Sequence, residues 1–272
     1  MTRTGQPPLP HFVTALILAS MFVASVSLAQ TPLVRTSPAE SPFPSVSGAE
    51  WTKIEGVGDR TYLAAVLRPD GAGSVPVVVV LHGALGLNQA MMSLADTVRQ
   101  AGFVVVIGCW QVGQAQTDGN RLCSEAIPQA DWLADPAALC CAKELIAMAR
   151  SLPGARTDRL GLYGLSIGGQ AALWIASKGG NVQAVVADAP PSANVRASLS
   201  GLSAPLLLLH GTADRVVPVE QTRQYEEAAR NLGKSVIAAY FDGAGHLASV
   251  QPESQAAARQ RAVAFLREHL MK

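Results

Sequence analysis

Residues 159–178 have the sequence RLGLYGLSIGGQAALWIASK, which gives the strongest local indication of the fold. The part up to Tyr163 predicts a strand, and the part from Ile167 predicts a helix. Between them, Gly164-Leu165-Ser166-Ile167-Gly168 fits the pattern G-x-S-x-G, in which a sharp turn from strand to helix exposes a serine. Glycine-rich turns with a purely structural role are common, so the pattern needs support from the rest of the chain.

The rest of the chain alternates strands with helices. Four consecutive valines within Val75 to Leu81 are typical of a strand buried on both faces. We expect strands at 61–67, 75–81, 103–107, 159–163, 182–187, 206–209 and 235–241, and helices at 88–101, 137–151, 167–178, 219–232 and 253–270. This alternation predicts an α/β fold with a mostly parallel central sheet and helices on both faces.

Two further residues complete a catalytic pattern with Ser166. Asp214 follows the strand at 206–209, and His246 follows the strand at 235–241. Ligands bind at the carboxyl ends of strands in such sheets. Serine, then aspartate, then histidine is the chain order of α/β-hydrolase triads. Asp188 follows the strand at 182–187 and remains an alternative acid.

These residue types suit nucleophilic catalysis. A neutral imidazole can take the proton of the Ser166 hydroxyl as it attacks, and the Asp214 carboxylate can orient the imidazole of His246. Backbone N–H groups should stabilise the oxyanion, one from Ile167 and one from the loop His82-Gly83-Ala84, where Ala84 is favoured. We interpret His210, at the end of a buried strand, as structural. His82 is expected to shape the loop of the oxyanion hole through its side chain, and His269 is expected to be a solvated residue of the last helix.

The chain resembles the dienelactone hydrolase family of α/β-hydrolases. The resemblance covers most of residues 60–270 and is strongest in His210–Asp214 with Val216-Val217-Pro218, in Tyr240–His246 and in Gly161–Gly169. It implies hydrolysis of small ester or lactone substrates without a metal or organic cofactor. The family's namesake enzymes carry a cysteine nucleophile where this chain has Ser166, which favours a general carboxylesterase over a dienelactone hydrolase in the strict sense.

The N-terminus has the pattern of a secretory signal. Arg3 precedes an apolar stretch from Phe12 to Leu28, and small residues then predict cleavage after Ala29. We expect a signal peptide over 1–29, a Pro- and Ser-rich disordered leader over 30–49, and a hydrolase domain over 50–272. The alternative is an uncleaved membrane anchor. The cleaved protein would be periplasmic or secreted.

Composition excludes some partners. Without residues 1–29 the chain has 20 basic and 20 acidic residues, which argues against nucleic-acid binding and against a basic membrane-binding patch. The expected partner is a small ester. The oligomeric state is not predicted.

Four cysteines remain, at positions 109, 123, 140 and 141. An even number in an exported chain permits disulfides, and three full pairings are possible. The preferred interpretation is a bridge from Cys140 or Cys141 to Cys109 or Cys123. The spacing does not match a zinc site.

The connections between elements predict an open site. The insertion from Ala189 to Ser203 is too short for a large lid, and the long connection 108–135 could form one wall. We expect a shallow cleft that prefers short acyl chains. A peptidase, a polysaccharide deacetylase, a polyesterase, an acyltransferase and a non-catalytic binding protein remain alternatives, because one fold hosts many functions.

Overall fold

The computed structural model describes residues 1, 35–43, 48–56, 61–71, 73–110, 121–123, 139–192 and 195–272. The chain divides by compactness into Met1–Thr31 and Pro32–Lys272, and the fold described below is that of the second unit. Apart from Met1, the segment expected to be a signal peptide lies outside the described residues.

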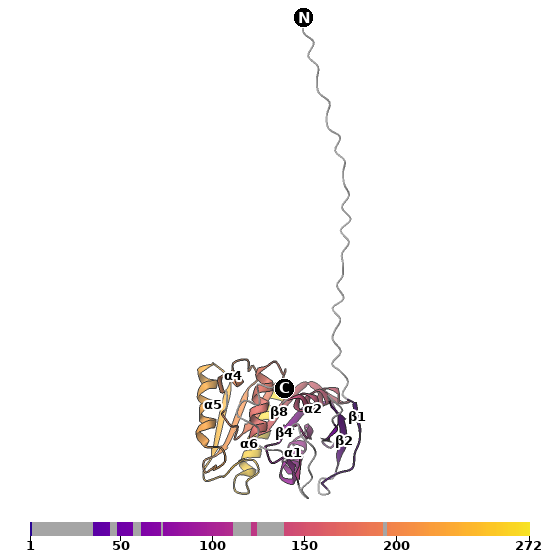
Figure 1. The fold of residues 1–272 in the computed structure, drawn as a ribbon, viewed down its shortest axis with the longest axis horizontal. Helices are drawn as coiled ribbons and strands as arrows, with labels where there is room; N and C mark the ends of the chain where they lie inside the picture. The colour runs from indigo at the N-terminus through magenta and orange to yellow at the C-terminus, as the bar shows by residue number, and fades with distance from the viewer. Residues whose placement is uncertain are drawn as a thin grey trace. The chain divides into compact units, whose positions relative to one another are not determined.

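A nine-stranded sheet forms the centre of the second unit, with the strand order β1-β2-β3-β6-β4-β8-β9-β10-β11 (Figure 1). The first four strands in this order pair antiparallel, and all later pairs are parallel. The mostly parallel sheet is therefore confirmed. The strands are β1 (Arg35–Pro38), β2 (Ala49–Glu55), β3 (Thr61–Leu67), β4 (Val75–Leu81), β6 (Val104–Gly108), β8 (Ala155–Leu165), β9 (Ala184–Asp188), β10 (Leu206–Gly211) and β11 (Val236–Phe241); β5 (Leu87–Asn88) and β7 (Arg121–Leu122) form a separate pair.

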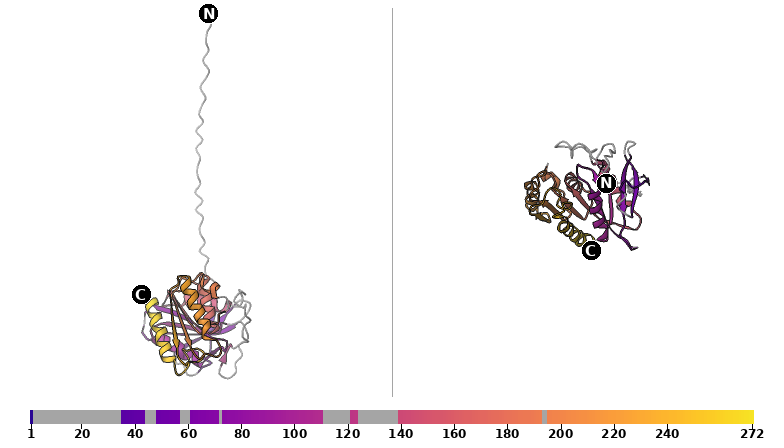
Figure 2. Two further views of the ribbon diagram at one scale, coloured as in Figure 1. Left: turned by 90° about the vertical axis from the view of Figure 1, so that its left-hand side faces the viewer. Right: turned by 90° about the horizontal axis from the view of Figure 1, so that it is seen from below.

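Helices cover both faces of this sheet (Figure 2). Helices α1 and α6 contact each other, and α3, α4 and α5 contact one another in succession. Among the described residues, none of the helices has the length and apolar character needed to cross a membrane. The helices are α1 (Gln89–Gln100), α2 (Cys140–Ser151), α3 (Ile167–Ser177), α4 (Val195–Leu199), α5 (Val219–Asn231) and α6 (Gln255–Leu270).

The core lies on the two faces of the central strands. Every residue from Val77 to Leu81 is fully buried, and β6, β9 and β10 are buried along their whole length. Strands in the middle of a parallel sheet have helices on both faces, so both sets of side chains must be apolar. This is why the four valines predict the position of β4 so closely.

The N-terminal edge of the sheet differs from the expectation. Residues 30–49 were expected to form a disordered leader, but Arg35–Pro38 forms β1 and pairs antiparallel with β2. Phe43 is buried, with its ring 5.9 Å from that of Trp51. The sheet therefore begins at Arg35, before the expected domain start at residue 50. All four residues of β1 are exposed, so their sequence has no alternating apolar pattern.

The parallel register places four loops at one edge of the sheet. Leu165 at the end of β8 is paired with Asp188 at the end of β9. Leu209 of β10 is also paired with Asp188, and Gly211 is paired with Phe241 at the end of β11. The loops after β8, β9, β10 and β11 therefore begin next to one another.

Candidate active site

Ser166 lies in a sharp turn between β8 and α3. Its backbone has φ 53° and ψ −122°, a conformation that a residue with a side chain rarely adopts. A Cβ on Gly164 would overlap the carbonyl of Gly168, and a Cβ on Gly168 would overlap the carbonyls of Leu81 and His82. The glycines of the pattern are therefore needed for the close approach of the helix to the end of β4. This is the strand-to-helix turn that the G-x-S-x-G pattern predicts.

Backbone donors adjoin the serine. A Cβ added to Gly83 would lie 3.3 Å from Cβ of Ser166, so the loop after β4 lies directly against the serine. In the described part of the chain, the N–H groups of Ile167 and Ala84 have no acceptor. Ile167 is the first residue of α3, where helix N–H groups are free and the helix dipole favours negative charge. Both N–H groups predicted for an oxyanion hole are therefore available.

Asp214 and His246 are in direct contact. Nδ1 of His246 lies 2.7 Å from Oδ2 of Asp214, and the carboxylate is fully buried while the imidazole is partly exposed. The other carboxylate oxygen accepts hydrogen bonds from the N–H groups of Val216 and Val217, at 2.8 and 2.9 Å. The contact fixes Nδ1–H as the donor, which leaves Nε2 of His246 able to accept a proton.

The loops that carry these two residues are joined by their backbones. The N–H of Thr212 donates to the carbonyl of Phe241, and that of Ala213 donates to the carbonyl of Ala244, both at 2.9 Å. A Cβ on Gly211 would overlap the carbonyls of Ala244 and Gly245. A glycine at the end of β10 thus allows the loop after β11 to lie against the loop that carries Asp214.

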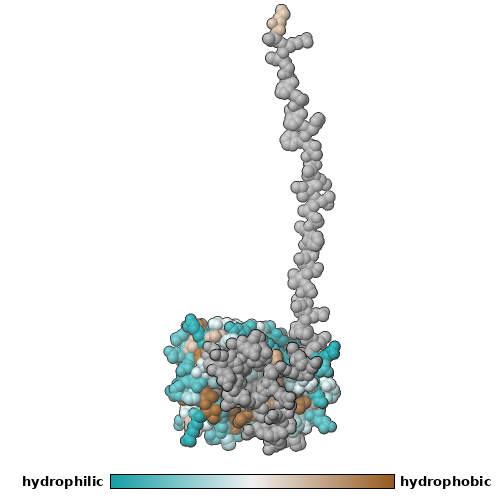
Figure 3. All heavy atoms as spheres, viewed as in Figure 1, coloured by the Kyte–Doolittle hydropathy of each residue, from teal (hydrophilic) through white to brown (hydrophobic). Residues whose placement is uncertain are grey.

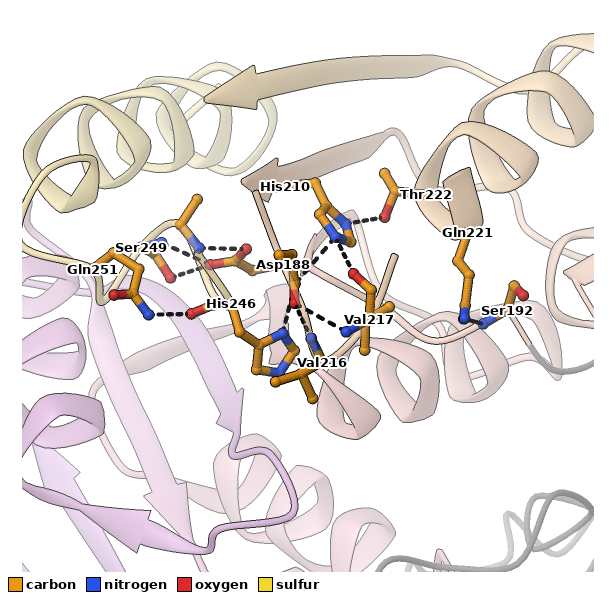
Figure 4. A network of polar contacts seen from close by, with 12 residues as sticks. Asp188, Ser192, His210, Val216, Val217, Gln221, Thr222, His246, Ser249 and Gln251 are labelled. Carbon is orange, nitrogen blue, oxygen red and sulfur yellow. Dashed lines mark hydrogen bonds and ion pairs between the residues drawn. The ribbon is translucent and has the colours of Figure 1, made fainter. Parts of the chain in front are cut away.

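Asp188, the alternative acid, has a different position. Its fully buried carboxylate accepts hydrogen bonds from the N–H groups of Ala248 and Ser249, at 3.1 and 2.8 Å, and from the Ser249 hydroxyl at 2.5 Å (Figure 4). Its backbone carbonyl accepts from the N–H of Ser166 at 2.8 Å. Burial raises the pKa of Asp188, although the bonds from Ser249 act in the opposite direction. Asp188 therefore ties the serine turn to the loop after His246.

Backbone strain is concentrated at this edge of the sheet. Besides Ser166, the non-glycine residues with positive φ include Ala189, at 51°, and Leu247, at 67°. Ala189 follows Asp188, and Leu247 follows His246. Such conformations persist only where the surroundings enforce them, and they are frequent at functional sites.

The hydroxyl of Ser166 is not hydrogen-bonded to the imidazole of His246 within the described structure. Among the described residues, no hydrogen bond joins Ser166 to His246. Catalytic hydrogen bonds are often long in structures without substrate and tighten when substrate binds. The structure thus brings Asp214 and His246 together directly and joins Ser166 to the histidine loop through Asp188.

His210 contributes a contact that the sequence interpretation missed. The side chain is fully buried, and its Nε2 lies 3.2 Å from Oδ2 of Asp214, the same oxygen that faces His246. Nδ1 of His210 lies 2.6 Å from the hydroxyl of Thr222. A histidine four residues before an aspartate carries no specific sequence signal, because the approach depends on the turn between them.

His82 is the first residue after β4, in the loop that was expected to supply an oxyanion donor. Its Nδ1 is 2.8 Å from the carbonyl of Gly83, and its Nε2 has no partner among the described residues. Complete burial lowers the pKa of His82 to about 4. The ring is therefore neutral at neutral pH and shapes the loop next to Ser166, in line with the role expected from the sequence.

The expected cysteine bridge is wrong. The structure brings the sulfurs of Cys109 and Cys123 within bonding distance, with their Cα atoms 5.6 Å apart. The sulfurs of Cys140 and Cys141 lie 3.4 Å from each other at the start of α2.

Several features of the pocket lie outside the described residues. Most of the connection 108–135, expected to wall the site, is among them. Leu85 and Val216, in the loops after β4 and β10, are large apolar side chains exposed near the site. On the described surface seen in Figure 3, hydrophobic residues occur as small separate areas in a mostly hydrophilic face. No group of acidic, cysteine and histidine residues within the described part could hold a metal ion.

The sequence of this chain is similar to the sequences of known proteins. A sequence model of the dienelactone hydrolase family matches residues 62–270. A protein of Azospirillum brasilense named "Putative carboxymethylenebutenolidase" is 26% identical over 231 residues, which cover 78% of this chain and 95% of that protein.

Solved structures share the fold. A dienelactone hydrolase from Anabaena variabilis aligns with a TM-score of 0.61 at 20% identity, over 87% of this chain and 99% of the other. An acylaminoacyl peptidase from Pyrococcus horikoshii aligns with a TM-score of 0.66 at 17% identity, but the match covers only 42% of that chain. At such low identity the likeness concerns the fold alone.

Proposed function

This chain belongs to the dienelactone hydrolase family, and from that premise we propose that it is an exported serine hydrolase that cleaves small ester or lactone bonds through an acyl-enzyme. Membership of the family makes it a hydrolase of ester or lactone bonds. The main observation in favour of catalysis by Ser166, His246 and Asp214 is the 2.7 Å contact between His246 and Asp214. This contact lies at the sheet edge where Ser166 has a positive φ.

The proposed reaction begins at Ser166. Its Oγ attacks the carbonyl carbon of the substrate while Nε2 of His246 takes the hydroxyl proton. The Asp214 carboxylate holds Nδ1–H of the imidazole and stabilises the imidazolium that forms. The tetrahedral oxyanion receives hydrogen bonds from the N–H groups of Ile167 and Ala84, both free of other acceptors within the described residues.

The second half returns the proton. His246 donates it to the leaving alcohol oxygen as the ester bond breaks, which leaves an acyl group on Ser166. A water molecule then attacks the acyl carbon, and its proton passes to His246. His246 returns that proton to Oγ of Ser166 as the acyl–oxygen bond breaks and the carboxylic acid product leaves. The cycle needs no group beyond the residues of the site.

Substrate size is proposed from the connections at the sheet edge. Between β9 and β10 the described residues contain only the short helix α4, so this connection supplies no large cap. The exposed side chains of Leu85 and Val216 offer limited apolar contact beside the site. We therefore favour small esters or lactones with short acyl groups over long-chain lipids.

Export is proposed from the N-terminal pattern and the cysteines. The apolar stretch before Ala29 has the form of a signal peptide, and a bond between Cys109 and Cys123 would persist in an oxidising compartment. The proposed location is the periplasm or the outside of the cell. The near-neutral charge supports a small-molecule partner rather than nucleic acid or a membrane surface.

Hydrolysis of p-nitrophenyl esters from acetate to decanoate tests the proposal. We expect turnover of the short esters and a loss in kcat on the order of 10⁴-fold or more in Ser166→Ala and in Asp214→Asn, since the triad acts as a unit. Circular dichroism spectra check that each variant is folded. Equal turnover by folded Ser166→Ala, or a steady rise in kcat/KM up to decanoate, would contradict the proposal.

A further inference from the structure

The loop after β4 holds the N–H of Ala84, a proposed oxyanion donor, in a fixed peptide plane. The carbonyl of Gly83 and the N–H of Ala84 belong to one planar trans peptide group, so they point in opposite directions. This carbonyl accepts from the N–H of Gly86 at 3.0 Å and lies 2.8 Å from Nδ1 of His82. Because a carbonyl can only accept, Nδ1 of His82 carries the hydrogen. Two donors therefore hold the carbonyl and direct the N–H of Ala84 away from themselves.

His82 is in turn held by Trp110. The Nε1–H of Trp110 donates to the backbone carbonyl of His82 at 3.0 Å, and the centroids of the two rings are 5.7 Å apart. Both side chains are fully buried. A Cβ on Gly168 would overlap the same carbonyl of His82, so the start of α3 lies against it. Trp110 thus contacts His82 both at its backbone and at its ring.

Trp110 lies where several segments of the chain are joined. The preceding residue, Cys109, donates its N–H to the carbonyl of Leu63 on β3 at 2.9 Å and is bonded to Cys123. Strand β7, which directly precedes Cys123, pairs with β5, which directly follows Gly86. The end of β6 is therefore connected to the chain on both sides of the loop that contains Ala84.

The direction of the Ala84 N–H matters for the proposed reaction. A Cβ on Gly83 would lie 3.3 Å from Cβ of Ser166, so the peptide group of Gly83 and Ala84 adjoins the nucleophile. An oxyanion is stabilised best by donors that already point at it before the charge forms. A peptide group that turned away would have to reorient during the reaction, and this cost would add to the barrier. A buried residue that prevents the turn therefore affects the rate without contact with the substrate.

We propose that Trp110 is a positioning residue that fixes His82 through its Nε1–H and thereby aligns the N–H of Ala84 with the oxyanion. The inference rests on the proposed function, because it requires an oxyanion to form beside Ser166. Such an alignment acts in the transition state and not on the bound ester. Loss of the hydrogen bond should therefore lower kcat and kcat/KM together and leave KM nearly unchanged.

Hydrolysis of p-nitrophenyl acetate by Trp110→Phe tests this role, because phenylalanine keeps an aromatic ring but has no N–H. We expect kcat/KM to fall on the order of tenfold, less than the loss of about 10²–10³-fold in kcat that follows removal of an oxyanion donor. A trifluoromethyl ketone, to which Oγ of Ser166 adds to form a tetrahedral oxyanion, should bind more weakly by the same factor. Partly misfolded protein would lower kcat but leave this inhibition constant unchanged. An unchanged inhibition constant would overturn the inference.

Trp51→Phe is the matched control. Trp51 on β2 is also buried, but its Nε1 has no hydrogen-bond partner among the described residues. The substitution removes the same atoms without loss of a hydrogen bond, so kcat/KM and the inhibition constant should match those of the wild type. Losses in Trp51→Phe equal to those in Trp110→Phe would contradict the proposal, because they would follow from the smaller ring and not from the N–H.

Replacement of Trp110 by benzothienylalanine decides the question even if Trp110→Phe fails to fold. This analogue has sulfur in place of the indole N–H and keeps the shape of the bicyclic ring. We expect the same fall in kcat/KM and the same weaker binding of the ketone. Wild-type values in this protein would overturn the inference and leave the proposed function intact. If the wild type itself has no turnover that depends on Ser166, the proposed function fails and the inference fails with it.

Discussion

At the scale of single residues, the site depends on buried groups that do not take part in the chemistry. Asp188 holds the serine turn through its backbone and the histidine loop through its carboxylate. Removing a partner from a buried, hydrogen-bonded charge is costly, because the remaining groups lose their compensation. Asp188 is therefore important for the site even though His246 contacts Asp214.

His82 gives a prediction for stability against pH. Burial lowers its pKa to about 4 in the folded protein, whereas an unfolded histidine binds a proton below about 6.5. Between these values the unfolded chain binds more protons, so stability from a neutral His82 is complete above pH 6.5 and is lost as the pH falls toward 4. At pH 4.5 the loss should be about 2–3 kcal/mol.

Urea denaturation of wild type and His82→Asn at pH 7 and pH 4.5 measures this effect. The variant lacks the titrating ring, so its free energy of unfolding should fall less over this interval than that of the wild type. The difference between the two proteins isolates His82 from the carboxylates that also titrate there. Equal losses in both proteins would show that His82 is not responsible.

The sequence predicts residues better than it predicts the contacts between them. Chain order and the expected strands point to Asp214 and His246, with Asp188 as an alternative acid, because each of these residues follows a recognisable strand. The contact between His210 and Asp214 depends on the path of the turn after β10, and the link from Asp188 to Ser249 spans 61 residues. Neither contact produces a periodic pattern in the sequence, so both are seen only in the folded structure.

At the scale of elements, the serine turn depends on how closely α3 approaches β4. A methyl group on Gly168 would overlap the backbone carbonyls of Leu81 and His82, which cannot rotate away. We expect Gly168→Ala to lower the free energy of unfolding by about 1–3 kcal/mol, as overpacking does, and to displace Ser166. Urea denaturation and ester hydrolysis measure the two effects.

Gly245→Ala is the matched control for this variant. A Cβ at Gly245 would meet only the Gln251 side chain, at 3.6 Å or more, which is ordinary contact. Its stability should stay within about 0.5 kcal/mol of the wild type. If Gly168→Ala is as stable and as active as the wild type, α3 does not need its close approach to β4.

Buried elements are predicted more accurately than exposed ones. The expected strand at 75–81 coincides with β4, and the expected helix at 219–232 differs from α5 by one residue. By contrast β8 begins at Ala155, four residues before the expected strand, because its first five residues are not buried and lack an apolar pattern. The five-residue helix α4 is too short for its period to be detected.

At the scale of the whole molecule, the fold extends closer to the N-terminus than composition indicates. Pairing of β1 with β2 and burial of Phe43 add Arg35 onward to the sheet. An edge strand tolerates proline, and its exposed residues need not be apolar, so the composition of this segment fits an edge strand as well as a disordered leader. Cleavage after Ala29 would leave β1 in the mature protein.

Processing and oxidation give the prediction that belongs to the whole chain. If the protein is exported, mass spectrometry of the mature form should find its N-terminus at Gln30. Thiol titration of the denatured protein should find two free thiols before reduction and four after it.

The bond between Cys109 and Cys123 joins the end of β6 to the chain after β7, so the double variant Cys109→Ser with Cys123→Ser should have a lower melting temperature than the wild type. Cys140→Ser leaves that bond intact and is the matched control. An N-terminus upstream of Phe12 would contradict cleavage of a signal peptide. Four thiols before reduction would contradict the bond between Cys109 and Cys123 and passage through an oxidising compartment.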